Sequence, residues 1–551
     1  MRLKRHESLM SNLPTVPVWH QGNSARTTYR VAPQNIERVI CHRLKNDIEQ
    51  YLIRWRSEDK SRPLLSWHSL DVLAECLAHV QVYLSKVTSR LHVHDGVSTS
   101  ETTSRSVSRK RKSPGAEPGS LWWGQPLNKE KHGLDVVISA ISSSASERSS
   151  TPSSGIESSD VFNCSFEKRA GYLVAKPVKD LTKLSLPTRQ MKDEAKNTPM
   201  TQAEHAIRQR FLEMLKESPG ICLENNVDST TPSLNFQFID GYVFNEGVQP
   251  LGDEFVVGCE KPCKPHMGGN CGCEYTAKCA CLEFAAVDED TLARKGGQEH
   301  EEYQRLKEEN GGMQPMTTPG LNPPKRFPYK KGVAGVPNTL QPFYLEQRFP
   351  IYECNLKCNC GPICKSRLVQ KGRQVWLTIF KTPDRGWGVR TNENLIRGEF
   401  IDVYLGEVLT NGEAQRREER ARKSGKDKAS YLYALDKFIG DDPGLDENTC
   451  HVVDGEYMGN VTRFMNHSCE PNCRQYTVSL NKNDIWVYNV AFFAYRDIAM
   501  GEELTFDYLD QDEQEEDEVL RMRQEEALDP NNNEKKSCNC GASKCRGYLW
   551  T

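Results

Sequence analysis

Two short stretches carry the strongest information about the fold of this chain: RFMNHSC at 463–469 and GEELTFDY at 501–508. The first ends in Cys469, and Cys473 follows four residues later. Close to the C-terminus, a small cluster offers three thiols: Cys538, Cys540 and Cys545. Structural zinc takes four Cys or His ligands. The sequence therefore predicts a zinc site in which the fourth ligand comes from the first stretch, with Cys469 and Cys473 as the candidates.

Cysteine is frequent upstream as well. The chain has 20 cysteines, and 16 of them lie between Cys259 and Cys545. No apolar stretch follows Lys4 and Arg5, which argues against a secretion signal, so metal binding is favoured over a disulfide framework. No apolar run reaches the ~18 residues that a membrane span needs.

Ten of the cysteines form two clusters: Cys259, Cys263, Cys271, Cys273, Cys279 and Cys281, then Cys354, Cys358, Cys360 and Cys364. With His266 as the one histidine nearby, they do not divide into independent four-ligand sites. Three zinc ions need 3×4 = 12 bonds, which six terminal and three bridging thiolates supply as 6 + 3×2. Nine cysteines would then suffice and one would be spare. An Fe–S cluster and buried free thiols are the alternatives, and packing alone would not need the Cys-x-Cys pairs.

Composition sets the remaining limits. A length of 551 residues predicts three or four units of roughly 150 residues, and a hydrophobic fraction of 37% predicts some linker. The net charge of −3, from 72 basic and 75 acidic residues, excludes a polycation that coats nucleic acid. We expect polar or acidic interruptions of the folded C-terminal region at 286–340 and 510–529.

The N-terminal half is predicted to hold one small domain and a linker. We expect a tail at 1–32, strands followed by a helix at 33–87, and a disordered Ser-rich and basic linker at 88–200. The run Arg109-Lys110-Arg111-Lys112 in that linker fits a nuclear import signal or a merely solvated charge run.

Residues 201–254 are predicted to form a helix and an extension of the region that follows. Thr201 and Glu204 form a possible capping box for a helix at 201–216. Its packing face would hold Ala203, Ile207, Phe211 and Leu215. The apolar run that begins at Phe236 is typical of a strand.

Together with RGWGV at 385–389, the two opening stretches resemble the SET-domain lysine methyltransferases. The ten-cysteine region resembles a pre-SET module and the last three cysteines a post-SET module. The combination resembles the suppressor-of-variegation class of histone H3 lysine-9 methyltransferases in its fungal form. The resemblance implies a mainly β fold of small sheets with a knot-like threaded C-terminal segment. The implied modules are pre-SET at 255–368, SET at 374–509 and post-SET at 534–551.

The resemblance also implies three structural zinc ions in the pre-SET cluster and one in the post-SET module. For the cluster we expect the ligands Cys259, Cys263, Cys273, Cys279, Cys281, Cys354, Cys358, Cys360 and Cys364. Cys271 would be the spare thiol, although this chain has Cys259-x-x-x-Cys263 where the family usually has Cys-x-Cys. The fourth post-SET ligand would be Cys469 rather than Cys473.

The implied reaction moves a methyl group from S-adenosylmethionine to a lysine amine. The amine must be neutral, which costs roughly 4.6 kcal/mol at pH 7, and a dry channel near the cationic cofactor lowers that cost. Tyr508 is expected to help the amine lose its proton and to orient its lone pair. Tyr404 would hydrogen-bond the amine or polarise the methyl group. Phe506, at a position that takes Phe or Tyr, implies di- and trimethylation.

The resemblance assigns further residues to the cofactor and the substrate. The backbones of Asn466 and His467 would hold the adenine, and Arg463 would meet the cofactor carboxylate or pack beside it. The other expected contacts are Arg385, Gly386, Trp387, Tyr431 and Trp550 for the cofactor and Asp436 for the substrate peptide.

Residues 33–87 resemble a divergent chromodomain, a methyl-lysine reader. A trimethylammonium group is held by cation–π contacts in an aromatic cage. Trp55 matches one cage position, whereas the other two hold Gln34 and Glu58, and Tyr29 or Tyr51 could substitute. A degenerate chromodomain that serves as a scaffold is favoured over a working reader.

Taken together, the sequence predicts a nuclear, chromosomal enzyme that methylates lysine 9 of the histone H3 tail and promotes heterochromatin and gene silencing. The alternatives are the same chemistry on another histone or non-histone lysine, and a catalytically inactive SET protein that acts as a chromatin adaptor. A zinc-finger DNA binder is disfavoured because the paired-histidine spacing is missing.

Overall fold

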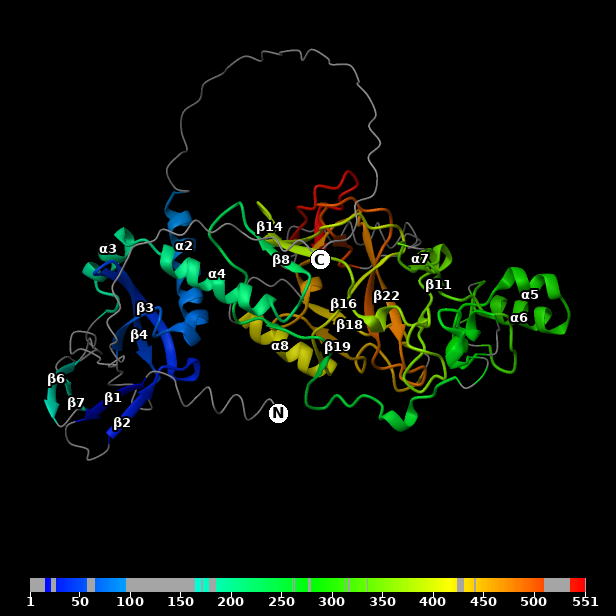
Figure 1. Cartoon of the computed structure of the whole chain (residues 1–551), viewed down its shortest axis with the longest axis horizontal. Helices are drawn as coiled ribbons and strands as arrows, with labels where there is room; N and C mark the ends of the chain where they lie inside the picture. The colour runs from blue at the N-terminus through cyan, green and yellow to red at the C-terminus, as the bar shows by residue number, and fades with distance from the viewer. Residues whose placement is uncertain are drawn as a thin grey trace, which may run out of the picture. The chain divides into compact units, whose positions relative to one another are not determined.

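The computed structural model describes residues 15–20, 26–56, 65–95, 164–169, 172–177, 185–259, 261, 263–275, 279–312, 314–315, 318–333, 335–423, 431–440, 442–509 and 536–550. In 15–20, 26–30, 89–95, 164–169 and 172–177, and at 536, 548 and 550, the backbone alone is described. The chain divides into two compact units, Met1–Pro199 and Met200–Thr551. Figure 1 shows the whole chain.

The N-terminal unit is built on an antiparallel sheet in the order β3-β4-β5 (Ile36–Lys45, Ile48–Trp55 and Leu65–Ser69), followed by helix α2 (Leu77–Asp95). The predicted order of strands and then a helix is therefore correct. The apolar positions that recur at helical spacing are all buried: Leu73, Leu77, Val80 and Leu84. Leu73 lies before the helix, and the other three lie in α2, which contacts β3.

The linker predicted for 88–200 is wrong in its last part. Helix α3 (Arg189–Asn197) begins after Thr188, whose hydroxyl accepts a hydrogen bond from the Met191 backbone. Met191 is buried in a cluster with sheet residues Ile40, Cys41, Leu52, Leu65 and Trp67. Leu186 and Ala195 pack against the same cluster. A few apolar contacts in a polar segment thus dock the helix, and composition does not reveal them.

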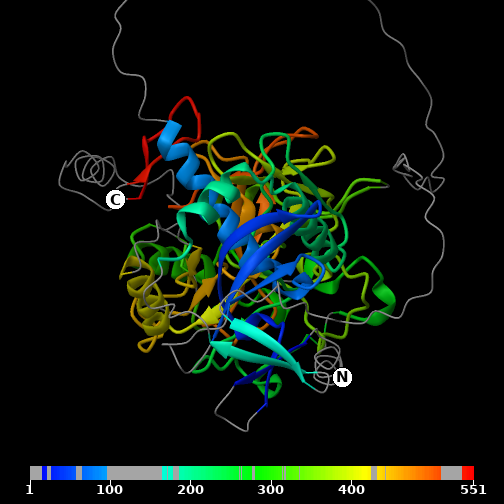
Figure 2. The same cartoon turned by 90° about the vertical axis from the view of Figure 1, so that its left-hand side faces the viewer.

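A second sheet of the same unit has the order β2-β1-β7-β6 (Arg26–Arg30, Thr15–His20, Tyr172–Pro177 and Cys164–Arg169). Its β6–β7 hairpin, which also lies in the predicted linker, is cyan in Figure 2. The expected basic run at 109–112 and most of the tail and linker lie outside the described residues.

The aromatic residues proposed for a methyl-lysine cage are core residues. Trp55 is 0% exposed, and its indole N–H donates to the Ser66 hydroxyl at 2.7 Å. Tyr51 is also 0% exposed, and its hydroxyl donates to Glu49. A cage needs open ring faces. Gln34 is exposed, and Glu58 and the Tyr29 side chain lie outside the described part of the chain.

We therefore predict that residues 1–199 bind a trimethyl-lysine H3 peptide with a Kd weaker than about 1 mM, or about −4 kcal/mol. Isothermal titration with the matching unmodified peptide as control measures this. Micromolar affinity specific to the methylated peptide would contradict the buried position of Trp55.

The C-terminal unit is mainly β and consists of small sheets, as predicted. Its principal sheets have the orders β15-β14-β8, β13-β22-β23-β16 and β10-β17-β19-β18. The strands are β8 (Ile221–Glu224), β10 (Val243–Phe244), β13 (Ile351–Tyr352), β14 (Leu377–Lys381), β15 (Trp387–Thr391), β16 (Phe400–Tyr404), β17 (Glu407–Leu409), β18 (Leu432–Ala434), β19 (Val452–Asp454), β22 (Cys473–Ser479) and β23 (Asn489–Ala494). The described residues also form short strand pairs, among them β9 (Gln237–Phe238) with β20 (Met458–Gly459), β11 (Tyr329–Lys330) with β12 (Thr339–Leu340), and β25 (Lys536–Ser537) with β26 (Tyr548–Trp550).

The stretches RFMNHSC at 463–469 and GEELTFDY at 501–508 meet in space. Strand β21 (Asn466–His467) pairs in parallel with β24 (Thr505–Phe506), with His467 opposite Phe506. Ser468 then donates its backbone N–H to the Phe506 carbonyl at 3.0 Å. This pairing brings the histidine of the first stretch beside the phenylalanine and tyrosine of the second.

The segment before the cysteine clusters is part of the same core. Helix α4 (Thr201–Leu215) buries the predicted face. The capping box is wrong, because Met200 is the N-cap residue and Thr201 is already helical. Beyond the helix, strands β8, β9 and β10 each pair in parallel with a strand from the remainder of the unit. Helix α8 (Asn411–Lys423) covers another part of that unit, and α7 (Pro342–Gln347) precedes β13.

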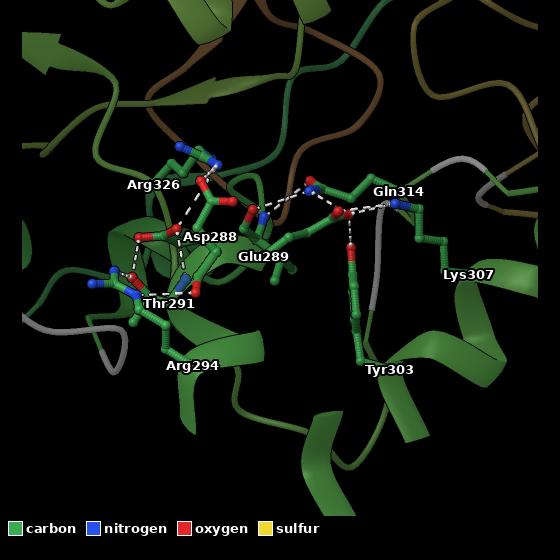
Figure 3. Close-up of polar contacts among 10 residues, drawn as sticks. Asp288, Glu289, Thr291, Arg294, Tyr303, Lys307, Gln314 and Arg326 are labelled. Atoms are coloured by element: carbon green, nitrogen blue, oxygen red, sulfur yellow. Dashed lines mark hydrogen bonds and ion pairs between the residues drawn. The ribbon is translucent and has the colours of Figure 1, made fainter. Parts of the chain in front are cut away.

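The polar stretch at 286–340, predicted to interrupt the fold, contains a helical hairpin of α5 (Glu289–Lys295) and α6 (Gln298–Glu309). In Figure 3 the Glu289 carboxylate accepts hydrogen bonds from Tyr303 at 2.8 Å, Lys307 at 2.9 Å and Gln314 at 3.0 Å. Asp288 caps α5, and Arg326 pairs with Asp290. Charge pairs and a small apolar cluster around Leu292 and Tyr303 hold this hairpin together, and its polar composition gave no sign of it.

Candidate active site and zinc centres

The pre-SET thiols gather in one buried region. Four sulfur atoms all lie within 4.8 Å of one another: Cys259, Cys281, Cys354 and Cys358. Three groups of three meet the same limit: Cys259, Cys263 and Cys279; Cys263, Cys273 and Cys354; Cys354, Cys360 and Cys364. The sulfur of Cys281 is 3.7 Å from that of Cys354 and 3.6 Å from that of Cys358. Tetrahedral zinc with 2.3 Å bonds has sulfur–sulfur edges of about 3.8 Å, so the donor set fits zinc.

Shared membership of these groups is what bridging thiolates require. Cys354 belongs to three of the groups, and Cys259 and Cys263 belong to two each. All nine cysteines expected as ligands occur in at least one group. Cys271 is 1% exposed but occurs in none of the groups formed by the described residues.

The post-SET thiols come together with the first of the two candidates. Cys469, Cys538, Cys540 and Cys545 lie within 4.8 Å of one another. The sulfur of Cys469 is 3.9 Å from that of Cys538 and 4.0 Å from that of Cys545, which again fits tetrahedral zinc. Cys473 is instead fully buried in β22 and bonds to Asn472.

Tyr404 and Tyr508 both point their hydroxyl groups at backbone carbonyls. Tyr404, at the end of β16, donates to the Tyr431 carbonyl at 2.8 Å. Tyr508 donates to the Met465 carbonyl at 2.8 Å. Burial raises the pKa of both phenols above the ordinary tyrosine value, so both are neutral at physiological pH. Each phenol oxygen therefore keeps lone pairs that can accept a hydrogen bond.

Phe506 sits between rings. Its ring centroid is 4.8 Å from that of Phe492 and 4.8 Å from that of Tyr508, and the side chain is 7% exposed. It therefore gives the region beside the Tyr508 ring an apolar wall.

The Asn466 side chain links the first residue of β15 to the GEELTFDY stretch. Its side-chain amide donates to the Trp387 carbonyl at 3.2 Å and to Glu503 at 2.9 Å. Arg385 holds the other oxygen of Glu503 at 2.6 Å. A side chain at Gly388 would lie 2.7 Å from the Glu503 carboxylate, so glycine is needed for this close packing. Gly386 has a φ of +73°, which also favours glycine.

Both ring nitrogens of His467 contact groups of the protein. Its Nδ1 accepts from the Tyr508 backbone N–H at 3.2 Å, and its Nε2 lies 3.2 Å from the Cys469 sulfur. Burial lowers the pKa of His467, so the ring is neutral. It thus connects a zinc-site thiol to the backbone of Tyr508.

The Arg463 guanidinium packs on aromatic rings. Its guanidinium lies 4.2 Å from the Tyr431 ring centroid and 5.0 Å from that of Phe236, and it donates to the Gly455 carbonyl at 3.1 Å. Of the two roles expected for Arg463, this geometry fits packing, and the contact with the cofactor carboxylate stays a prediction. Phe236 itself comes from the segment before β9, and it was missed because a lone aromatic in an apolar run carries no signal for a site.

The remaining expected residues are more peripheral. Tyr431 is partly buried, and its carbonyl also accepts from the Gly455 backbone. Asp436 is exposed just after β18. The backbone of Trp550 pairs with Lys536, and its side chain lies outside the described part of the chain.

Two further residues of the site, Glu503 and Arg546, were not predicted from the sequence. Glu503 lies within the GEELTFDY stretch, which could have drawn attention to it.

Two protein-family models match the part of the chain that holds these residues. Residues 386–509 match the SET domain family and residues 213–367 the Pre-SET motif family. The chain is 36% identical over 339 residues to "Histone-lysine N-methyltransferase, H3 lysine-9 specific KMT1" of Fusarium mangiferae, covering 60% of this chain and 88% of that protein. It is 37% identical over 340 residues to the Neurospora crassa protein of the same description, dim-5, with the same coverage. The solved structure of the Neurospora SET domain protein DIM-5 is 34% identical, with a TM-score of 0.41, over 53% of this chain and 95% of that one.

Proposed function

This chain belongs to the SET-domain histone-lysine methyltransferases, and we propose that it di- and trimethylates lysine 9 of histone H3. The observation that carries the proposal is that Tyr404, Phe506 and Tyr508 pack in one core cluster, in a chain whose relatives in two fungi are named for that lysine. The proposed setting is chromatin in the nucleus, where this mark promotes heterochromatin and silencing. No helix among the described residues has the length and apolar character of a membrane span.

S-adenosylmethionine, when bound, supplies an electrophilic methyl group on a sulfonium. The residues that would hold it are Arg385, Gly386, Trp387, Tyr431, Asn466 and His467, with Arg463 behind Tyr431. Gly386, where a Cβ would meet nothing within 4 Å, leaves space for a ligand that approaches the backbone closely. Trp550 and Asp436 keep their proposed roles at the cofactor and at the substrate peptide.

We assign the two phenols to accepting hydrogen bonds from the lysine amine. The Tyr508 proton is engaged by Met465, and that of Tyr404 by the Tyr431 carbonyl. With raised pKa values, neither phenol ionises to serve as a base near neutral pH. Tyr508 therefore orients the amine lone pair, and the dry channel favours the neutral amine by desolvation. This narrows the role that the sequence assigned to Tyr508.

The zinc ions are proposed to be structural, because the thiols form closed groups that leave no need for a metal-bound water. We assign three ions to the nine pre-SET cysteines and one to the post-SET four. Zinc there would order the chain around the site and take no part in the chemical step.

Phe506→Tyr is expected to shift the product from trimethyl to mainly monomethyl lysine, with the first transfer nearly unchanged. Each later transfer needs room for added methyl groups beside residue 506, and a hydroxyl there can fix a water molecule. A penalty of about 2.7 kcal/mol on the later steps slows them ~100-fold. Time-resolved mass spectrometry on an H3 peptide measures this. Trimethyl product accumulating at the parental rate would exclude Phe506 as the product switch.

The target lysine is tested by mass spectrometry of H3 tail peptides after incubation with the purified chain and S-adenosylmethionine. We expect di- and trimethylation of the unmodified peptide and none when lysine 9 is replaced by arginine. Replacement of lysine 4 serves as the matched control. Methylation that persists without lysine 9, or is absent from every H3 peptide, would overturn the target.

A further inference from the structure

The turn that carries Tyr508 is tied to the post-SET segment by an arginine–carboxylate pair. Arg546 donates from Nη1 to Oδ2 of Asp507 at 2.7 Å and from Nη2 to Oδ1 at 2.6 Å. The two side chains are 16% and 15% exposed. A two-bond pair of this kind, shielded from water, fixes geometry more firmly than an exposed ion pair does.

Each partner is anchored to a functional element. Arg546 directly follows Cys545, and its backbone N–H donates to the Cys469 sulfur at 3.4 Å. Arg546 is therefore linked to the post-SET thiol site twice, through the chain to Cys545 and through a hydrogen bond to Cys469. Asp507 directly precedes Tyr508, and its Oδ1 also accepts from the Leu509 backbone at 3.0 Å. The carboxylate thus spans the turn in which Tyr508 stands.

The other contacts of Tyr508 depend on the same turn. Its backbone N–H reaches His467, and its hydroxyl reaches the Met465 carbonyl. Asp507 Oδ1 lies 3.5 Å from His467 Nδ1. Without the guanidinium, a largely buried carboxylate would lose its cation and turn toward solvent. The Tyr508 hydroxyl would then move with the turn.

We propose that Arg546, acting through Asp507, is a positioning residue for Tyr508 and couples the metal state of the post-SET thiol site to the chemical step. The proposal rests on the proposed role of Tyr508 as the acceptor that orients the amine. Arg546 touches neither amine nor methyl group, so its effect should appear in kcat more than in zinc content.

Kinetics of the full, zinc-loaded chain provide the first test. We expect Arg546→Gln to lower kcat about tenfold or more, with zinc content unchanged and KM for S-adenosylmethionine within about threefold. Arg546→Lys should recover part of the rate. Combining Arg546→Gln with Asp507→Asn should cost little more than the worse single change, because both break one pair. Lys544→Gln, an exposed neighbour, is the matched control and should behave like the parent.

Hydrogen exchange gives a second readout that needs no substrate. In Arg546→Gln, backbone amides in 504–509 should exchange about tenfold faster than in the parent, and in Lys544→Gln they should not. Cys540→Ser, which opens the thiol site, should loosen the same segment. Unchanged exchange in Arg546→Gln, fully additive kinetics, or loss of zinc in step with activity would each overturn the proposal. If exchange at 504–509 changed as expected but the chain methylated no H3 peptide, the result would count against the proposed target alone.

Discussion

Tyr508→Phe is expected to lower kcat at least ~100-fold, equivalent to about 2.7 kcal/mol in the barrier. The change removes one hydroxyl and almost no volume. That hydroxyl points at the Met465 carbonyl, and its oxygen is the acceptor proposed for the lysine amine. Without it, the amine has one fewer contact that fixes its lone pair, and the reactants lose alignment. Initial rates on an H3 peptide at saturating S-adenosylmethionine measure the effect.

The fold of this variant should persist. Losing the hydrogen bond to Met465 leaves a buried carbonyl unpaired, which costs about 1–3 kcal/mol of stability, and zinc content should equal that of the parent. Tyr457→Phe, at an exposed tyrosine, is the matched control. A Tyr508→Phe enzyme within twofold of the parental rate would show that the orienting role belongs elsewhere, with Tyr404 as the first alternative.

Sequence alone predicted the architecture where a pattern reports on geometry directly. The spacing of Ala203, Ile207, Phe211 and Leu215 predicted the buried face of α4 because helical periodicity and burial are linked. The motifs at 463–469 and 501–508 predicted the threaded SET fold, which the family match to 386–509 confirms. Helix α3 and the α5–α6 hairpin were not predicted, because only a few apolar contacts and some charge pairs hold them within polar segments. Polar composition there is indistinguishable from that of a linker.

The residues of the candidate site also fall into those that the sequence could predict and those that it could not. The thiols could be listed from spacing, since zinc needs soft ligands close together, but which of them share an ion depends on three-dimensional distances. The packing of the Arg463 guanidinium on Tyr431 and the full burial of Trp55 could not be predicted, because motif position does not report burial. The contacts made by Arg546 and Phe236 could not be predicted from the sequence. Their partners, Asp507 and the Arg463 guanidinium, lie 39 and 227 residues away along the chain.

Cys540→Ser is expected to abolish most activity and to lower the zinc content by about one ion per chain. Structural zinc binds small sites with apparent free energies of about 10–16 kcal/mol, and that energy is folding energy for the segment around it. The described post-SET segment has one short strand pair, β25 with β26, and its thiols lie against Cys469. Without the metal, little else would hold 536–550 against the catalytic region, so Arg546 and the Trp550 strand would leave it.

The measurement pairs metal analysis with kinetics on one protein preparation. The pre-SET cluster should stay loaded, because its thiols form separate groups from those of the post-SET site. Cys222→Ser, at an exposed free thiol outside both groups, controls for the chemistry of the substitution and should keep full zinc content and full activity. If Cys540→Ser lost its ion yet retained the parental rate, closure of the post-SET segment would not be required for methyl transfer. The contacts from Arg546 to Asp507 would then be packing alone.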